Sequence, residues 1–419
     1  MSARARPLAA YGAVTASYWA FMLTDGALRM LVLLHFHTLG FSPVQLAYLF
    51  VLYEVAGVVT NLCAGWIAAR FGLTSTLYAG LSLQIIALLA LAGLDPEWSL
   101  WASVTFVMAV QGLSGVAKDL SKMASKSAVK LLAPTEGGDL FRWVAVLTGS
   151  KNAVKGIGFF LGAVMLGAVG FIPAILGMAT ILGIVLAAVM IFMPSGLPRG
   201  LKGVKFREVW STNARINWLS VARLFLFGAR DVWFVVGIPV YFYAVLSDGS
   251  EAGNRAVFFA IGSFMAVWII LYGIVQASAP VLLRAKGRDE AAMIAMARGL
   301  VALLSLIPLG LAVVVASSGA PSEALTWTLV AGLLVFGFVF ALNSALHSYL
   351  ILAFTGPERV TMDVGFYYMA NAGGRLVGTV LSGASYQFGG LAGCLTTAAV
   401  FCGLSWLAAR RLQAVRLGD

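Results

Sequence analysis

Apolar runs of about 20 residues or more recur along the whole chain, and short polar connections separate them. Because a helix needs about 20 mostly apolar residues to cross a bilayer, this pattern predicts about twelve membrane-spanning helices. One longer polar connection, residues 194–213, divides them into two sets of about six. The expected spans are 11–39, 44–69, 74–94, 99–124, 140–169, 173–193, 214–246, 256–282, 291–315, 324–354, 363–388 and 391–409.

Composition agrees with this pattern. Of 419 residues, 61% are hydrophobic and 11% are charged, which excludes a soluble globular protein and predicts an all-α membrane protein. The net charge of +11 is dispersed among apolar spans, so nucleic acid is not an expected partner, whereas membrane lipid is. Cys63, Cys394 and Cys402 have no metal or redox spacing and are expected to pack inertly, and we expect no metal and no cofactor.

Charge in the connections predicts an orientation. Lysine and arginine are concentrated in every second connection, while aspartate and glutamate occupy the others. Since basic loops stay in the cytoplasm, we expect both termini and the connector to be cytoplasmic. The expected domains are an N-terminal half, 1–193, a linker, 194–213, and a C-terminal half, 214–419. A faint repeat supports two halves: Phe21-x3-Asp25 matches Phe227-x3-Asp231, and Asn152…Lys155…Gly158 echoes Asn371…Arg375…Gly378.

Lys151 and Lys155 lie near the middle of the predicted span 140–169. A charged group at the bilayer centre costs roughly 2.5–3.5 kcal/mol on insertion scales. Residues four apart share one helical face, so these two like charges also repel each other. Such a pair is tolerable if it faces water, an opposite charge or an anionic cargo, and the rest of the chain favours the cargo.

Further charges fall at similar depth in other predicted spans. Arg223, Phe227 and Arg230 share one face by their spacing of four and three. Positive side chains outnumber negative ones, which predicts a cationic cavity for an anion with several charges. The candidate substrate-binding residues are Lys151, Lys155, Arg223, Arg230, Arg375, Arg29, His347, Asn371 and Tyr367. The candidates for charge pairing or proton coupling are Asp25, Glu54, Asp231 and Asp119.

Several of these charges also have a structural interpretation. Asp25 and Arg29 are four residues apart, which allows them to pair with each other, and such a pair is explained equally well by helix packing alone. Asp231 is expected to reach Arg230 only through another helix, because adjacent residues diverge. Glu54 either takes up a proton or pairs with a lysine. The stripe Lys118, Lys122 and Lys126 is explained equally well by cargo binding and by snorkelling of the ammonium groups to the lipid headgroups.

The distribution of charge resembles that of the major facilitator superfamily. The predicted spans 74–94, 173–193 and 391–409 contain no charged residue, as expected if every third helix faces lipid. The segment Gly65–Gly72 resembles the loop signature of that superfamily, although Ala69 stands where the signature has an acidic residue. The resemblance implies about twelve transmembrane helices in two pseudo-symmetric six-helix bundles, with alternating access by rocking of the halves around a midplane site.

Five longer blocks of the chain are Leu23–Gly40, Gly112–Leu132, Arg142–Gly162, Ala222–Tyr241 and Asp363–Gly383. They resemble one family within the superfamily, the ArsJ organoarsenical efflux permeases of bacterial arsenic-resistance operons, which implies a place in a bacterial inner membrane. The resemblance implies export of 1-arseno-3-phosphoglycerate and hence arsenate resistance. That compound arises when glyceraldehyde-3-phosphate dehydrogenase uses arsenate instead of phosphate, which makes this enzyme a functional partner. We expect a monomer that is not an enzyme.

The membrane potential favours export of an anion, and other functions compete with this one. An anion of charge about −3 that leaves a cell gains roughly 7 kcal/mol per 100 mV, so export does not require protons, although exchange through Glu54 or Asp25 stays open. The alternative function is uptake or exchange of a sugar phosphate, phosphoglycerate or inorganic phosphate. A hydrophobic cation would be repelled, which disfavours drug export. No convergent nucleophile, histidine cluster or acidic metal site suggests an integral membrane enzyme.

Overall fold

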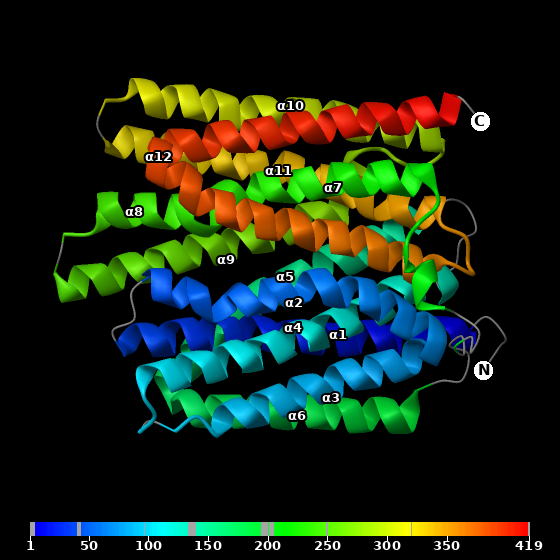
Figure 1. Cartoon of the computed structure of the whole chain (residues 1–419), viewed down its shortest axis with the longest axis horizontal. Coiled ribbons are helices and arrows are strands. Elements are labelled where there is room, and N and C mark those ends of the chain that lie inside the picture. The colour runs from blue at the N-terminus through cyan, green and yellow to red at the C-terminus, as the bar shows by residue number, and fades with distance from the viewer. Residues whose placement is uncertain are drawn as a thin grey trace. The chain divides into compact units, whose positions relative to one another are not determined.

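The computed structural model describes residues 5–39, 43–95, 97–132, 140–193, 200, 205–248, 250–319 and 321–417, and these residues are almost entirely helical (Figure 1). Eight of the described helices are long and apolar enough to cross a membrane. Half of the predicted linker, 194–213, lies outside the described residues, namely 194–199 and 201–204. The helices are α1 (Ala5–Thr38), α2 (Pro43–Phe71), α3 (Leu73–Ala92), α4 (Leu100–Leu132), α5 (Leu140–Val169), α6 (Phe171–Phe192), α7 (Ala214–Val232), α8 (Ile238–Leu246), α9 (Glu251–Leu282), α10 (Glu290–Ser317), α11 (Glu323–Phe354) and α12 (Val360–Leu417).

Two irregularities of the described helices bear on the predicted spans. The span 214–246 consists of α7 and α8, joined without a break by the π-helical turn η3 (Trp233–Gly237). A π-helical turn inserts one residue into the helical repeat, and such turns occur often at functional sites. Within α12 the helix breaks at Gly390, where φ is 57° and ψ is −154°. Glycine adopts this conformation readily, so the break falls where the sequence predicts the boundary between its last two spans.

The described chain forms two compact units. The first contains Met1–Ser211 and Thr355–Met369, and the second contains Thr212–Phe354 and Ala370–Asp419. The first unit thus takes in a short segment from the predicted C-terminal half. A Cβ atom on Gly65 would lie 2.6 Å from the carbonyl oxygen of Thr361, so only glycine allows α2 to pack this closely against that segment. The predicted halves, 1–193 and 214–419, stay a prediction.

In the first unit α1 packs along α5, α2 and α3 pack along α4, and α3 lies beside α6 (Figure 1). The outer surface of α6 is apolar and exposed, with Ile184, Ile191 and Phe192 each more than 60% accessible. Exposed apolar side chains of this size on a long apolar helix are expected where the helix faces hydrocarbon. This expected contact with lipid accounts for the absence of charge in the predicted span 173–193.

Glycines set the close approach of α5 to α1. A Cβ atom built on Gly158 would lie 2.3 Å from the carbonyl oxygen of Leu23 on α1. The second unit repeats this device, because a Cβ on Gly374 of α12 would lie 2.0 Å from the carbonyl oxygen of Leu224 on α7. Small residues allow membrane helices to approach at backbone distance, which substitutes for a hydrophobic driving force between helices in lipid.

Gly158→Ala is therefore expected to destabilise the protein. The added methyl group forces α5 away from α1, and overpacking of this kind costs about 1–3 kcal/mol. The thermal unfolding midpoint of the purified protein in detergent is expected to fall by several degrees. Gly183→Ala on α6 is the matched control, because no heavy atom lies within 4 Å of its Cβ position. Equal midpoints for both variants would show that the α1–α5 contact is looser than described.

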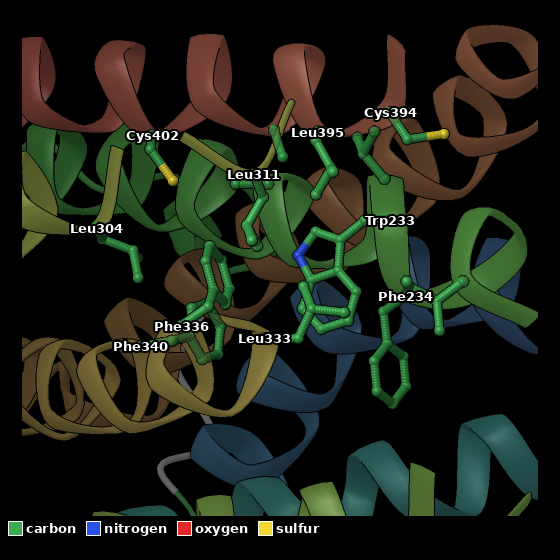
Figure 2. Close-up of a cluster of buried hydrophobic side chains, with 14 of the residues drawn as sticks. Trp233, Phe234, Leu304, Leu311, Leu333, Phe336, Phe340, Cys394, Leu395 and Cys402 are labelled. Atoms are coloured by element: carbon green, nitrogen blue, oxygen red, sulfur yellow. The ribbon is translucent and has the colours of Figure 1, made fainter. Parts of the chain in front are cut away.

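The second unit is organised around an aromatic core (Figure 2). Trp233, at the start of the π-helical turn, is fully buried, and its ring lies edge-on to those of Trp268 and Phe336 at centroid distances of 5.7 and 5.4 Å. Such edge-to-face pairs contribute about 0.5–1.5 kcal/mol each beyond their burial. Cys394 and Cys402 are buried without a disulfide, as expected for packing residues. This core holds α7 and η3 against α9, α11 and α12.

Candidate functional site

Charged side chains of α1, α2, α4 and α5 form a first basic cluster, which is centred on Asp25 of α1. Its carboxylate is buried and accepts a hydrogen bond of 2.9 Å from the Tyr53 hydroxyl of α2. The Lys155 ammonium of α5 donates to the other carboxylate oxygen and forms an ion pair with it. Two helices therefore supply partners to one buried charge on a third helix. Removal of either partner would leave the buried carboxylate less well compensated and would destabilise the fold.

Arg29 lies one turn further along α1. Its guanidinium pairs with Glu54 of α2 at 3.2 Å and stacks over the Tyr53 ring, 4.0 Å from the centroid. The ammonium group of Lys118, on α4, lies 3.8 Å from the centroid of the same ring. A buried tyrosine thus contacts two cations through its ring and one carboxylate through its hydroxyl. Cation–π contacts of this kind are worth about 2 kcal/mol when they are desolvated.

A second carboxylate, Asp119 on α4, lies in the same unit and is completely buried. It pairs with Lys122 at 2.7 Å and accepts hydrogen bonds from Thr60 at 2.8 Å and from Asn61 at 3.0 Å. Lys126, one turn further along α4, has an exposed fraction of only 2% and donates to the Thr148 hydroxyl of α5. Burial of Lys122 and Lys126 is incompatible with snorkelling to the headgroups, which was one of the two explanations open from the sequence.

The first basic cluster contains more positive than negative side chains among the described residues. Lys151, one turn before Lys155 on α5, is half-buried and adds another positive charge to the same helix. The surplus remains even though individual cations have carboxylate partners. The six cations are Arg29, Lys118, Lys122, Lys126, Lys151 and Lys155, and the three carboxylates are Asp25, Glu54 and Asp119.

The second basic cluster lies in the second unit and is centred on Asp231 of α7. The Arg230 Nε donates to one carboxylate oxygen at 2.6 Å, and the Arg375 Nε of α12 donates to the other at 3.2 Å. Asp231 itself is buried, whereas the two arginine side chains are partly accessible. One carboxylate therefore holds two guanidinium groups, and the pair of arginines retains a net positive charge.

Arg223, two turns before Arg230 on α7, is buried among neutral acceptors. Its Nε donates to the Asn371 amide oxygen at 2.8 Å, and its Nη1 donates to the Ser344 hydroxyl at 3.0 Å. The Phe227 ring lies between two arginines, 3.9 Å from the Arg223 guanidinium carbon and 4.9 Å from that of Arg230. The predicted common face of Arg223, Phe227 and Arg230 is confirmed.

Buried polar atoms without hydrogen bonds also occur on α11, the helix that carries Ser344. His347 on α11 is 1% exposed, and its Nδ1 atom has no partner among the described residues. Both side-chain amide atoms of Asn343, one turn earlier on α11, are likewise buried and unpartnered within the described chain. Leaving a buried polar group unsatisfied costs about 1–3 kcal/mol, so these atoms are candidates for contacts with a polar ligand. Tyr367, also predicted, belongs to the first unit, where its ring packs 5.0 Å from Tyr368.

The two clusters repeat one another. Asp25 and Asp231 are the residues that the internal sequence repeat aligns, and each pairs with the cation that the second half of the repeat aligns, Lys155 in one unit and Arg375 in the other. The same helices of each repeat are involved, namely α1 with α5 and α7 with α12. The correspondence of residues that contact each other makes the weak sequence repeat a structural one.

Comparison with known proteins identifies solved structures with a similar fold. No family model matches the chain, and no curated protein matches it. A bacterial homologue of the iron transporter ferroportin in the outward-facing state is similar over 97% of this chain and 99% of its own, with 15% identity and a TM-score of 0.72. The E. coli fucose:proton symporter FucP is similar over 97% and 99%, with 11% identity and a TM-score of 0.68. The human organic anion transporter MFSD10 is similar over 98% and 100%, with 14% identity and a TM-score of 0.63.

The chain has the major facilitator fold. The expected fold class, about twelve transmembrane helices in two pseudo-symmetric six-helix bundles, is thereby confirmed. At identities of 11–15% the likeness concerns the fold alone, and the ligands named for those proteins belong to them.

Two interpretations of ion pairing from the sequence were wrong. Asp25 does not pair with Arg29, because Lys155 and Tyr53 occupy both of its oxygens and Arg29 turns to Glu54. Arg230 does pair directly with the adjacent Asp231, since the long arginine side chain folds back along α7. The expected surplus of positive over negative side chains is present in each cluster. Several of the individual cations nevertheless have a carboxylate partner.

Several cluster residues were not singled out from the sequence. Tyr53 contacts three charged side chains, and its position beside Glu54 in an otherwise apolar span was the available signal. In the second unit Ser344 accepts from Gln276 at 3.0 Å and lies 3.0 Å from the Tyr272 hydroxyl, in addition to its bond with Arg223. Polar residues inside membrane helices were the signal there too.

Proposed function

We propose that this protein is a membrane transporter for an organic anion with several negative charges. The supporting observation is the composition of the two basic clusters, above all Asp231, which holds two arginines with a single carboxylate. Three charged groups that carry a net positive charge at membrane depth are costly unless an anion neutralises them. Arginine and lysine bind phosphate and carboxylate oxygens through charge-assisted hydrogen bonds, which are about twice as strong as neutral ones.

We propose further that the cargo is 1-arseno-3-phosphoglycerate and that the transporter exports it across a bacterial inner membrane. A phosphate group carries about −1.5 to −2 charges near neutrality, and the arsenate end adds more. The resemblance of long sequence blocks to organoarsenical efflux permeases supports this substrate. One solved protein with this fold, MFSD10, is described as an organic anion transporter, which agrees with the class of cargo. Glyceraldehyde-3-phosphate dehydrogenase would supply the compound.

Transport into everted membrane vesicles tests this proposal. Vesicles from cells that express the protein are incubated with arsenate, glyceraldehyde 3-phosphate, NAD and glyceraldehyde-3-phosphate dehydrogenase, and the arsenic retained by the vesicles is measured. Retention that depends on the complete mixture and on the protein is expected. The control omits the dehydrogenase, so that only free arsenate is present.

The alternative transporter function gives a different result in the same vesicles. A sugar-phosphate, phosphoglycerate or phosphate transporter accumulates labelled 3-phosphoglycerate or phosphate at least as well as the arsenic compound. Strong competition by 3-phosphoglycerate together with equal transport of it would favour this alternative. Absence of any anion transport by protein that reaches the membrane would contradict both.

A further inference from the structure

A groove on the second unit lies apart from the basic clusters. It runs between the start of α7 and the last part of α12 and has a volume of about 620 Å³. On α7 its wall is formed by Trp218, Val221 and Phe225, which are three and four residues apart and therefore share one face. This face differs from the one that carries Arg223 into the second basic cluster.

The opposite wall comes from α12. Leu404 and Leu407 line the groove and are 38% and 49% exposed, so the wall is apolar and open to the surroundings of the protein. The floor is fixed by a hydrogen bond of 2.7 Å from the Ser405 hydroxyl to the Ala222 carbonyl oxygen, which ties α12 to α7. A polar metabolite has nothing to bind along such walls, whereas an acyl chain does.

One end of the groove is strongly basic. Arg410 and Arg411 both line it and both are exposed, and the Arg410 guanidinium stacks 5.0 Å from the ring centroid of Trp406. From Leu404 to Arg411 the helix rises about 10 Å, which is within the roughly 15 Å depth of one leaflet's hydrocarbon. The groove therefore combines apolar walls that suit an acyl chain with two arginines about 10 Å away along the helix, a separation that suits a lipid headgroup.

We propose that this groove binds an anionic phospholipid, with an acyl chain between α7 and α12 and the phosphate on Arg410 and Arg411. Basic pockets between membrane helices bind lipids with anionic headgroups, because each arginine near the surface adds attraction and the apolar walls add burial. Charge complementarity selects this occupant over a second copy of the chain, whose apolar helices would leave the two arginines without a counter-charge.

Native mass spectrometry of the full-length protein in detergent tests the proposal, with phosphatidylglycerol and phosphatidylcholine as probes. The wild type is expected to retain phosphatidylglycerol in preference to phosphatidylcholine. Arg410→Gln with Arg411→Gln is expected to weaken phosphatidylglycerol binding about thirtyfold, since each arginine contributes about a factor of five. Lys286→Gln with Arg288→Gln, which removes two exposed charges elsewhere, is the matched control and is expected to bind like the wild type.

A second variant separates a built site from general attraction to charge. Val221→Trp fills the groove without altering any arginine, and it is expected to abolish retention of phosphatidylglycerol while the unfolding midpoint in lipid-free detergent is kept. Wild-type binding by Val221→Trp, or by the double arginine variant, would overturn the proposal. So would a concentration-dependent dimer that Val221→Trp disrupts, because the groove would then be an interface between two copies.

Discussion

Lys155→Met combined with Asp25→Asn is expected to restore folding but not transport. Lys155→Met alone leaves the buried Asp25 carboxylate without its ion-pair partner, and loss of one member of a buried pair costs about 3–5 kcal/mol. The second substitution removes that charge and keeps an oxygen for the Tyr53 hydroxyl. Transport is expected to stay low because the Lys155 ammonium group, which we propose binds cargo, is still missing, although the net charge of the cluster is unchanged.

The comparison of single and double variants separates structure from function at this pair. Protein in the membrane is measured by fluorescence-detected size exclusion, and transport by arsenic retention in everted vesicles. The single variant is expected to be scarce, and the double variant is expected at nearly wild-type abundance. Its transport is expected to be at least tenfold lower, as follows from loss of a charge-assisted bond worth about 1.5–3 kcal/mol. Wild-type transport by the double variant would show that the pair only holds α1 to α5.

Arg375→Gln is the second prediction with a large expected effect. Asp231 has two guanidinium partners, so loss of Arg375 leaves it bound to Arg230 at 2.6 Å. The variant is therefore expected to fold at about wild-type abundance, unlike Lys155→Met. Transport is expected to fall at least tenfold, because the surplus positive charge of the second cluster is reduced.

Arg288→Gln is the matched control for this experiment. It removes an arginine with the same charge change, and its side chain is exposed outside the cluster. Its transport is expected to equal that of the wild type. If Arg375→Gln transported normally while present in the membrane, Arg375 would have no role in binding cargo.

Helix positions were largely predictable from the sequence, because a bilayer demands apolar runs of a fixed length. The predicted span 214–246 coincides with α7, η3 and α8 together, and the predicted boundary between 388 and 391 coincides with the break at Gly390. The π-helical turn at Trp233 was not predictable, because it depends on packing in the aromatic core and not on hydropathy.

Partners of the buried charges were predicted less well. Spacing along one helix suggested Asp25 with Arg29, but a carboxylate that faces a neighbouring helix pairs with whatever that helix presents, here Lys155. The internal repeat was the better guide, since it aligned Asp25 with Asp231 and Lys155 with Arg375 before any contact was known. Equivalent helices of two structural repeats can keep equivalent contacts even where the sequence similarity between the repeats is weak.

The burial of the lysines on α4 was the least predictable feature of the site. Lys122 and Lys126 lie near one end of a predicted span, where a long side chain normally reaches the headgroups. Asp119 and Thr148 on neighbouring turns and helices hold them inside instead. Only the packing of α4 against α2 and α5 decides between these outcomes, and that packing cannot be read from one helix.

Binding of 3-phosphoglycerate to the purified protein tests the central claim most directly. This compound has the phosphate of the proposed cargo and a carboxylate in place of its arsenate end, so it probes the basic clusters without chemistry. Equilibrium dialysis should show saturable binding by the wild type, and binding at least tenfold weaker for Arg375→Gln and for the Asp25→Asn, Lys155→Met double variant. Equal binding by all three folded proteins, or preference for a hydrophobic cation such as tetraphenylphosphonium, would contradict the account.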